Sequence, residues 1–285
     1  IMPLYALLAM GIAAGAEWLI GVGRRGSRSG LRVLLLVALI LLTLYRAALS
    51  VGPANARNRP DDTGLAPGWA ILADDPPVGA AILGTLPEAA ALDYLTIIWG
   101  RRPDLRSVTS EQARTLLAQG APVMATRAAL PLVAQEVSAD AHYSALGRML
   151  IRIAATPART QPPGLQAWKH DFSPTLRLTG GKVYRDAASG ELVALLVWQA
   201  SAQPTEDWAV SVRLTQAGQE IAQVDHQHPV FGAYPTSRWS AGEVVADAYP
   251  LPAPPDAQAD GLTVILYRRL ADGSFVNLGA ARLPL

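Results

Sequence analysis

Two adjacent carboxylates, Asp74 and Asp75, stand in the segment ILADDPP and could bind a divalent cation or act as a general base. Successive side chains of an extended chain point in opposite directions, so the two carboxylates would not converge on one ion. Pro76 and Pro77 follow directly and are typical of a turn. We therefore interpret the pair as a solvated turn without a metal.

A second cluster contains the carboxylate of Asp225 and the imidazoles of His226 and His228. On a strand the two histidines would share one face, and two imidazoles with a carboxylate can hold zinc. Pro229 ends such a strand at once, however, and the cluster lacks convergent partners. We interpret it as a polar loop between strands. The sequence thus predicts no metal site and no cofactor.

The segment YPTSRW brings Tyr234, Arg238 and Trp239 close together. Aromatic rings and a guanidinium group can form a platform that stacks on a sugar ring and hydrogen-bonds its hydroxyls. We take these three residues as candidate carbohydrate-binding residues. The alternative is that Trp239 packs under the loop as a corner anchor and that Arg238 pairs with an acid such as Glu243.

Motifs of known catalytic types do not occur in this sequence. It has no serine in a GxSxG elbow and no phosphate-binding loop, and the lack of cysteine excludes thiolate chemistry and disulfides. Asp93 and Tyr94, on an expected helix, could face a ligand cleft at the edge of a parallel sheet. The glycines of Thr179-Gly180-Gly181 are expected in a hairpin turn. We predict no catalytic residue.

The charge distribution argues against nucleic-acid binding. The 285 residues carry a net charge of +1, but the first 51 residues contain five arginines and one glutamate. The rest of the chain is therefore mildly acidic and has no basic stripe that could follow a phosphate backbone.

Two apolar blocks open the chain, Leu4 to Val22 and Leu31 to Leu49, each about the ~20 residues that an α-helix needs to cross a bilayer. Arginines cluster between them, and arginine near a membrane span is retained in the cytoplasm. We therefore expect a transmembrane hairpin at residues 1–51, a cytoplasmic loop from Gly23 to Gly30, and residues 50–285 on the extracytoplasmic side of the cell membrane, with the lipid bilayer as a partner. The start at Ile1 suggests a piece of a longer chain.

Beyond a linker at 52–67, the pattern predicts a small α/β extracytoplasmic domain at 68–155. Short apolar runs alternate with helical patterns in the order β-α-β-α-β, which favours a parallel sheet. The second helix has Ser110 as its expected N-cap and Gly120 at its end. The expected elements are strand 80–83, helix 87–99, strand 105–108, helix 110–118, strand 122–126 and a further strand at 148–154.

The period changes to two after Thr156 to Gly164, a segment rich in proline. Several short strands with turns between them and no helical window predict an antiparallel β-sandwich at 165–285. The expected strands are 192–199, 208–214, 220–225, 244–251, 262–267 and 275–282.

The stretch from Trp208 to Asp256 resembles the C-terminal sandwich of bacterial membrane glycosyltransferase-like proteins of the protein O-mannosyltransferase kind (GT-C type). The segment AAILGTLPEAAALDYLTIIWGRRPDLRSV is similar to the α/β unit that follows the membrane helices in those proteins. The shared motif comprises Tyr234, Pro235, Thr236, Ser237, Arg238, Trp239, Gly242 and Glu243, followed by a proline-rich turn like Pro252 to Asp256.

In that family, sugar transfer is attributed to acidic residues in the first extracytoplasmic loop of a large helical bundle, and no residue of this chain matches that position. The resemblance therefore implies a non-catalytic, extracytoplasmic C-terminal region that binds or positions a glycan or a lipid-linked sugar acceptor. Upstream helices of a longer chain would be a further partner. The alternative is a purely structural or protein-assembly module anchored in the membrane.

Overall fold

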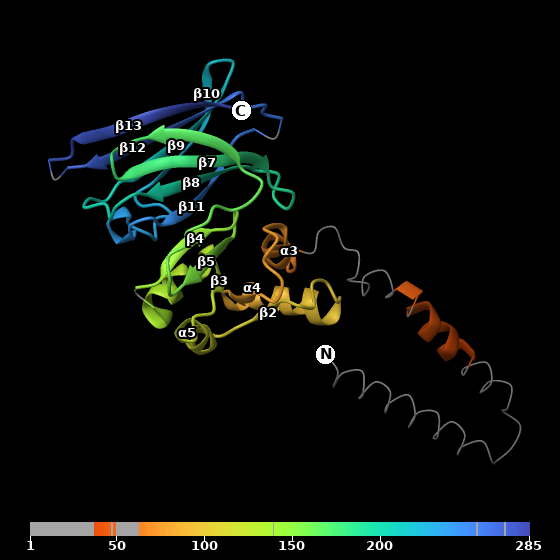
Figure 1. Ribbon diagram of the computed structural model, residues 1–285. Coiled ribbons are helices and arrows are strands. Elements are labelled where there is room, and N and C mark those ends of the chain that lie inside the picture. The colour runs from red at the N-terminus through yellow and green to blue at the C-terminus, as the bar shows by residue number, and fades with distance from the viewer. Residues whose placement is uncertain (1–36, 47, 50–62, 139, 255, 271) are drawn as a thin grey trace, which may run out of the picture. The chain divides into compact units, whose positions relative to one another are not determined.

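The structure, a computed structural model, describes residues 37–46, 48–49, 63–138, 140–254, 256–270 and 272–285 (Figure 1). Within these ranges, no helix is long and apolar enough to cross a membrane. This finding contradicts the predicted fold class with two transmembrane helices. The first apolar block, Leu4 to Val22, and the loop after it lie outside the described residues. Of the second block, residues 37–46 and 48–49 are described and helical, and residues 31–36 and 47 lie outside the described ranges.

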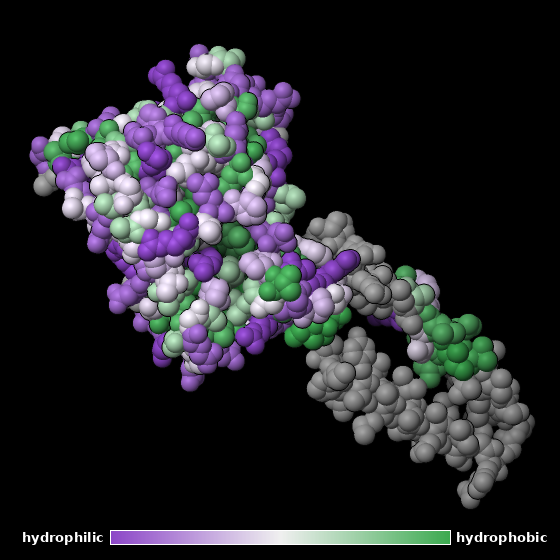
Figure 2. All heavy atoms as spheres, viewed as in Figure 1, coloured by the Kyte–Doolittle hydropathy of each residue, from purple (hydrophilic) through white to green (hydrophobic). Residues whose placement is uncertain are grey.

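The chain divides into two compact units, Ile1–Asp62 and Thr63–Leu285. In the described part of the first unit, apolar side chains such as Leu41 and Leu44 are exposed. Figure 2 shows hydrophobic residues gathered on this segment. The second unit contains a five-stranded sheet, built from residues 81–154, and two four-stranded sheets, built from residues 166–284. Of the expected linker at 52–67, residues 52–62 lie outside the described ranges.

The five-stranded sheet has the strand order β2-β1-β3-β5-β4. Strand β1 is parallel to β2 and β3, but β5 runs antiparallel to β3, and β4 runs antiparallel to β5. The predicted parallel sheet is therefore corrected to a mixed sheet. The cause is local, because only four residues separate β4 from β5 and so short a connection can join only antiparallel strands. The strands are β1 (Ala81–Leu83), β2 (Arg106–Ser107), β3 (Val123–Thr126), β4 (His142–Ala145) and β5 (Leu150–Ala154).

Helices α4 and α5 each begin with a capping box, at Thr85 and Thr109. Before α4, the side chain of Glu88 accepts the N–H of Thr85 at 2.8 Å. Before α5, Thr109 Oγ1 accepts the N–H of Gln112 at 3.3 Å, so the cap is Thr109 and not the predicted Ser110. The helical elements are α3 (Ala66–Ala73), α4 (Leu86–Asp93), η3 (Tyr94–Ile98), α5 (Ser110–Ala118), η4 (Arg127–Ala129), α6 (Leu130–Leu132) and η5 (Val133–Val137).

The C-terminal strands form two antiparallel sheets, one with the order β11-β8-β7-β6 and the other with the order β10-β9-β12-β13. Their facing sides share one hydrophobic core, in which Trp198, Leu214 and Val264 are buried. The strands are β6 (Gln166–Asp171), β7 (Leu176–Arg185), β8 (Leu192–Ala200), β9 (Ala209–Gln216), β10 (Gln219–His226), β11 (Val244–Leu251), β12 (Gly261–Arg269) and β13 (Phe275–Pro284).

Strand β8 is buried on both faces. Leu196 and Trp198 point into the core between the two sheets, whereas Leu195 and Val197 belong to a second apolar cluster that includes Ala145 of β4. A strand covered on both faces reads as a continuous apolar run, and β8 reads LVALLVWQA. The sheet that contains β8 is thus the middle layer between the mixed sheet and the outer sheet (Figure 1).

Two hydrogen bonds join this middle layer to the chain that precedes it. The N–H of Ala246 on β11 donates to Ser144 Oγ on β4 at 3.0 Å, and the N–H of Val244 donates to the carbonyl of Ala158 at 2.8 Å. The mixed sheet therefore docks at the β11 edge. This junction places the candidate site described below.

Gly180 and Gly181 do not form the predicted hairpin turn but lie inside β7, next to a register shift that follows Leu178. A side chain at Gly181 would meet the ring of Trp168 at 2.1 Å and the carbonyl of Leu195 at 2.5 Å. The absence of a side chain at these glycines thus allows neighbouring groups to approach the backbone of β7 closely.

Candidate functional site

A turn after β10 has three consecutive residues in the left-handed region of backbone space. The φ angles are 55° at Val230, 57° at Phe231 and 85° at Gly232. Only glycine reaches this region freely, and a β-branched residue there is an outlier at a cost of about 1–3 kcal/mol. Such strain persists only where the surroundings impose it, and it clusters at functional sites. The turn therefore marks this part of the molecule as a candidate site.

A buried carboxylate beneath the turn holds it in place. Asp247, on β11, has no exposed surface, and its Oδ1 accepts the N–H of Val230 at 2.7 Å. Its Oδ2 accepts the hydroxyl of Tyr249. Burial raises the pKa of Asp247 to about 7, although these hydrogen bonds and those from backbone N–H groups, including that of Phe231, oppose the rise. One carboxylate thus fixes the backbone that presents Phe231.

Arg127 follows directly on β3 and lies against this turn. Its backbone N–H donates to the carbonyl of Met149 at 2.8 Å, which fixes the start of its side chain. The guanidinium carbon lies 4.9 Å from the centre of the Phe231 ring, the geometry of a cation–π contact. The mixed sheet thereby supplies a cation, and the turn after β10 supplies the ring on which it rests.

A second guanidinium group comes from the YPTSRW segment. Arg238 ends the short helix η6 (Thr236–Arg238), and its Nη2 donates to the carbonyl of Ala141 at 3.1 Å. Its guanidinium carbon lies 5.7 Å from the ring centre of Tyr143 and 5.4 Å from that of Tyr234. Residues of the mixed sheet and of the sandwich therefore position this arginine together.

Behind Arg238, a buried polar network crosses the junction. The carboxylate of Glu243 accepts the Tyr234 hydroxyl at 3.0 Å and the N–H of Ser240 at 2.8 Å, and it lies 3.0 Å from Nδ1 of His142 on β4. The same Nδ1 of His142 also lies 2.7 Å from the Tyr234 hydroxyl, so the three side chains form one hydrogen-bonded cluster. Burial raises the pKa of Tyr234, and the negative charge of Glu243 adds to the rise. The network keeps Tyr234 a neutral donor and fixes β4 against the sandwich.

These elements enclose a groove of about 470 Å³, a volume within the range of small-molecule sites, roughly 300–1,000 Å³. Among the described residues, its lining contains no carboxylate, histidine, serine or cysteine. The groove thus combines two cations with an apolar and aromatic wall. It is lined by Arg127, Leu130, Pro131, Ala134, Tyr143, Phe231, Gly232, Ala233 and Arg238.

Of the three predicted carbohydrate-binding residues, Arg238 lines the groove, whereas the other two lie behind it. Tyr234 is 1% exposed and Trp239 is fully buried, with ring centres 6.1 Å apart. Neither ring offers a face on which a sugar could stack. Trp239 occupies the place that the alternative interpretation gave it, as an anchor under the loop, and Glu243 contacts His142 and Tyr234.

Of the nine described lining residues, only Arg238 was identified from the sequence. The other arginine, Arg127, and both aromatic residues, Tyr143 and Phe231, were missed. They come from η4, β4 and the turn after β10, and no motif connects them. A signal existed only for Phe231, because Pro-Val-Phe-Gly between two strands is a turn sequence. The groove arises from the docking of the mixed sheet on the sandwich, which local sequence patterns do not encode.

The histidine cluster forms no metal site. His226 ends β10, and its ring stacks on Tyr249 with centres 4.6 Å apart. Burial, together with the positive charge of Arg127, lowers the pKa of His226 to about 4. Across the part of the chain that the structure describes, no three side chains of His, Cys, Asp or Glu lie close enough to hold a metal ion.

Asp74 and Asp75 point apart, as expected, but only Asp75 is a solvated turn residue. Asp75 is highly exposed and pairs with Arg102 at 3.2 Å. Asp74 accepts three backbone N–H groups of the β4–β5 turn, at 2.6–2.9 Å. Burial raises its pKa in spite of these bonds. The predicted solvated turn is therefore corrected at Asp74, which ties α3 to the mixed sheet.

Asp93 and Tyr94 are occupied by contacts within their own layer. The hydroxyl of Ser107 donates to Asp93 Oδ1 at 2.7 Å, and the Tyr94 ring meets the edge of Trp99. Neither residue lines the groove at the junction.

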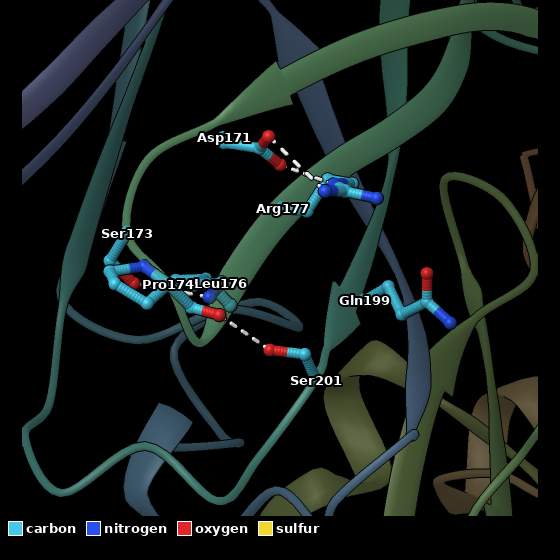
Figure 3. Close-up of a pocket in the computed structure, with 7 residues that line it drawn as sticks. All are labelled: Asp171, Ser173, Pro174, Leu176, Arg177, Gln199 and Ser201. Carbon is cyan, nitrogen blue, oxygen red and sulfur yellow. Dashed lines mark hydrogen bonds and ion pairs between the residues drawn. The ribbon is translucent and has the colours of Figure 1, made fainter.

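A smaller pocket, of about 220 Å³, lies where β6 turns into β7 (Figure 3). Figure 3 shows Asp171 and Arg177 pointing toward each other as an ion pair, and the Ser201 hydroxyl donates to the carbonyl of Pro174 at 2.6 Å. Because its main polar groups satisfy one another, this pocket is a weaker candidate than the groove.

Comparison of the chain with protein-family models, with curated proteins and with solved structures finds no match. The resemblance to glycosyltransferase-like proteins therefore stays a prediction.

Proposed function

We propose that the chain is a non-catalytic binding region of a glycosyltransferase-like protein and that the groove at the junction binds a carbohydrate. The single observation that carries the proposal is the groove itself, in which Arg127 and Arg238 stand beside an aromatic wall. Guanidinium groups donate several hydrogen bonds in a fixed plane, which suits hydroxyl and ring oxygens. Apolar side chains can cover the C–H faces of a sugar ring.

Binding fits the lining better than catalysis does. Among the described lining residues, the hydroxyl of Tyr143 is the one side-chain group that could serve as a general acid or base. Burial raises the pKa of Tyr143 above its usual value, so this hydroxyl keeps its proton. It also lies 3.4 Å from the carbonyl of Ser138. General acid–base work needs a pKa near the working pH, which this residue lacks.

The direct test is calorimetric titration of the full chain with a panel of neutral and acidic sugars. Phe231→Asn removes the ring from the groove while asparagine tolerates the left-handed backbone of that position. We expect this variant to weaken binding by roughly tenfold, as for the loss of an aromatic contact worth ~1–1.5 kcal/mol. The matched control is Phe275→Asn, because Phe275 lies exposed on β13. Equal effects of both variants would contradict the proposal.

A second candidate function, protein assembly, is favoured by an apolar surface at the end of α4. Trp69, Ile97 and Ile98 are exposed there, and the rings of Trp69 and Tyr94 both contact Trp99. Contiguous apolar surface on a folded protein often marks an interface. Analytical ultracentrifugation of wild type and of Ile97→Asp tests this function. A concentration-dependent complex that the variant abolishes supports assembly, whereas the same monomer in both excludes self-assembly through this surface.

A further inference from the structure

The groove is positively charged as well as aromatic. Two guanidinium groups and, among the described residues, no carboxylate line it. The buried acids Asp247 and Glu243 do not line it: Asp247 is engaged with Val230 and Tyr249, and Glu243 is engaged with His142, Tyr234 and Ser240. The positive charge of Arg127 extends to His226, where it helps to lower the pKa of the imidazole. A ligand in the groove therefore meets a positive potential.

Both guanidinium groups are held against aromatic faces. Arg127 rests on Phe231 at 4.9 Å, and Arg238 rests on Tyr143 and Tyr234 at 5.7 and 5.4 Å. An arginine stacked in this way has lost much of its rotamer freedom before a ligand arrives, so less entropy is lost on binding. Its N–H edge suits the planar oxygens of a carboxylate or the oxygens of a phosphate, which it can bind with two hydrogen bonds.

We infer that the ligand of the groove is an acidic sugar, whose carboxylate or phosphate group binds at Arg127 and Arg238 while its ring lies against the wall that contains Phe231 and Leu130. The inference rests on the proposed function, because it names the chemical class of ligand for the same groove. Two arginines in one small site are more than the hydroxyls of a neutral sugar require, whereas an anion uses both charges.

The test is calorimetric titration of the full chain with four probes: glucuronic acid, glucose 1-phosphate, glucose and inorganic phosphate. We expect at least one acidic sugar to bind tenfold or more tightly than glucose, since charge-assisted hydrogen bonds are about twice as strong as neutral ones. We expect its affinity to fall as salt is added, because ions screen the attraction. The preferred acid shows whether the groove selects a carboxylate or a phosphate.

Variants locate the site. Arg127→Gln should weaken binding of the acidic sugar about tenfold, which corresponds to ~1.4 kcal/mol, and weaken glucose binding by a smaller factor, because only the acidic sugar loses a charge-assisted hydrogen bond. Arg127→Lys keeps the charge but loses the paired donors, so its effect should be intermediate. The matched control is Arg282→Gln, because Arg282 is exposed on β13 and its loss removes the same charge. Circular dichroism checks that each variant is folded.

The outcomes separate this inference from the proposed function. Equal affinity for glucose and the acidic sugars, unaffected by Arg127→Gln, would overturn the acidic ligand and leave carbohydrate binding standing. Binding of inorganic phosphate as tightly as glucose 1-phosphate, lost in Arg127→Gln, would support the anion site and overturn the carbohydrate. An equal loss in Arg282→Gln would overturn the assignment to this groove.

Discussion

The carboxylate of Asp247 accepts the backbone N–H of Val230 at 2.7 Å, directly beneath a turn in which Val230 has a φ of 55°. The valine is fully buried and β-branched, and by itself it would leave this conformation. The bond keeps the turn in place, and the next residue, Phe231, presents its ring to the groove. The shape of the candidate site thus depends on a side chain that does not line it.

Replacing Asp247 should destabilise the fold in proportion to the acceptors removed. Asp247→Ala leaves the N–H of Val230 and the hydroxyl of Tyr249 buried without an acceptor, each at a cost of ~1–3 kcal/mol. Asp247→Asn keeps one oxygen and should cost clearly less. Urea denaturation measures the free energy of unfolding of each variant. Equal losses in the two variants would show that the hydrogen bonds do not hold the turn.

The raised pKa of Asp247 should make the stability of the fold depend on pH. The pKa of Asp247 is about 7 in the fold against 3.8 in a free chain. As the pH rises from about 4, the unfolded chain ionises first, so the folded state loses stability until about pH 7 and no further above it. In Asp247→Asn this loss is absent. The free energy of unfolding of wild type minus that of the variant should therefore fall steadily between these pH values and be flat beyond them.

His226 should act in the opposite direction over nearly the same range. Its pKa is about 4 in the fold against 6.5 in a free chain, so the unfolded state takes up a proton first as the pH falls below 6.5, and the fold loses stability down to about pH 4. We expect His226→Gln to remove this loss. The free energy of unfolding of wild type minus that of His226→Gln should then decrease toward acid pH. A difference independent of pH would contradict the burial of the imidazole.

The hairpin between β9 and β10 offers a stabilising substitution. Ala217 and Gly218 have φ values of 50° and 76°, the left-handed pair that a two-residue hairpin turn needs. The left-handed conformation is unfavourable for alanine and is tolerated by asparagine. Ala217→Asn should therefore raise the free energy of unfolding by ~0.5–1 kcal/mol. Gly218→Ala is the matched control and should lower it by a similar amount. Thermal denaturation of both variants shows whether the first change stabilises the fold and the second destabilises it.

The spacing of apolar residues predicted much of the strand pattern. Strand β11 has the expected bounds, Val244–Leu251, and α5 occupies the expected 110–118 because its cap and its apolar face are local signals. Strands β6 and β7 were missed, since β7 contains Gly180 and Gly181, which ordinarily indicate a turn. Trp168 on β6 occupies the space that a side chain at Gly181 would need, and a local sequence pattern cannot show this contact.

The candidate site was less predictable than the strands. Arg238 was recognised from an aromatic and basic segment, but the sequence does not show that its neighbours Tyr234 and Trp239 face inward. One signal was available for the junction, because the unbroken apolar run of β8 indicates a strand covered on both faces. It implies a third layer. The apolar run of β8 does not predict that Arg127 of the third layer contacts the ring of Phe231.

The approach of β6 to β7 can be tested at Gly181. A Cβ at this position would lie 2.1 Å from the ring of Trp168 and 2.5 Å from the carbonyl of Leu195, so Gly181→Ala requires the backbone to shift. We expect a loss of ~2 kcal/mol or more, as for overpacking of a core. Gly279→Ala, which meets only the Phe172 ring at 3.2 Å, is the milder control. Similar losses in both variants would argue against the close approach.

Glu243 should determine how firmly the mixed sheet is held at the junction. Glu243→Ala removes the acceptor of the Tyr234 hydroxyl and of the Ser240 N–H, and it removes a partner of His142; an unsatisfied buried donor costs ~1–3 kcal/mol. Because His142 belongs to β4, hydrogen exchange should accelerate first in β4 and β11. Glu243→Gln keeps one oxygen and should have an intermediate effect. Glu220→Ala removes the exposed partner of Arg213 on β10 and should cost only ~0–1 kcal/mol. If Glu243→Ala costs no more than this control, the network does not hold the two sheets together.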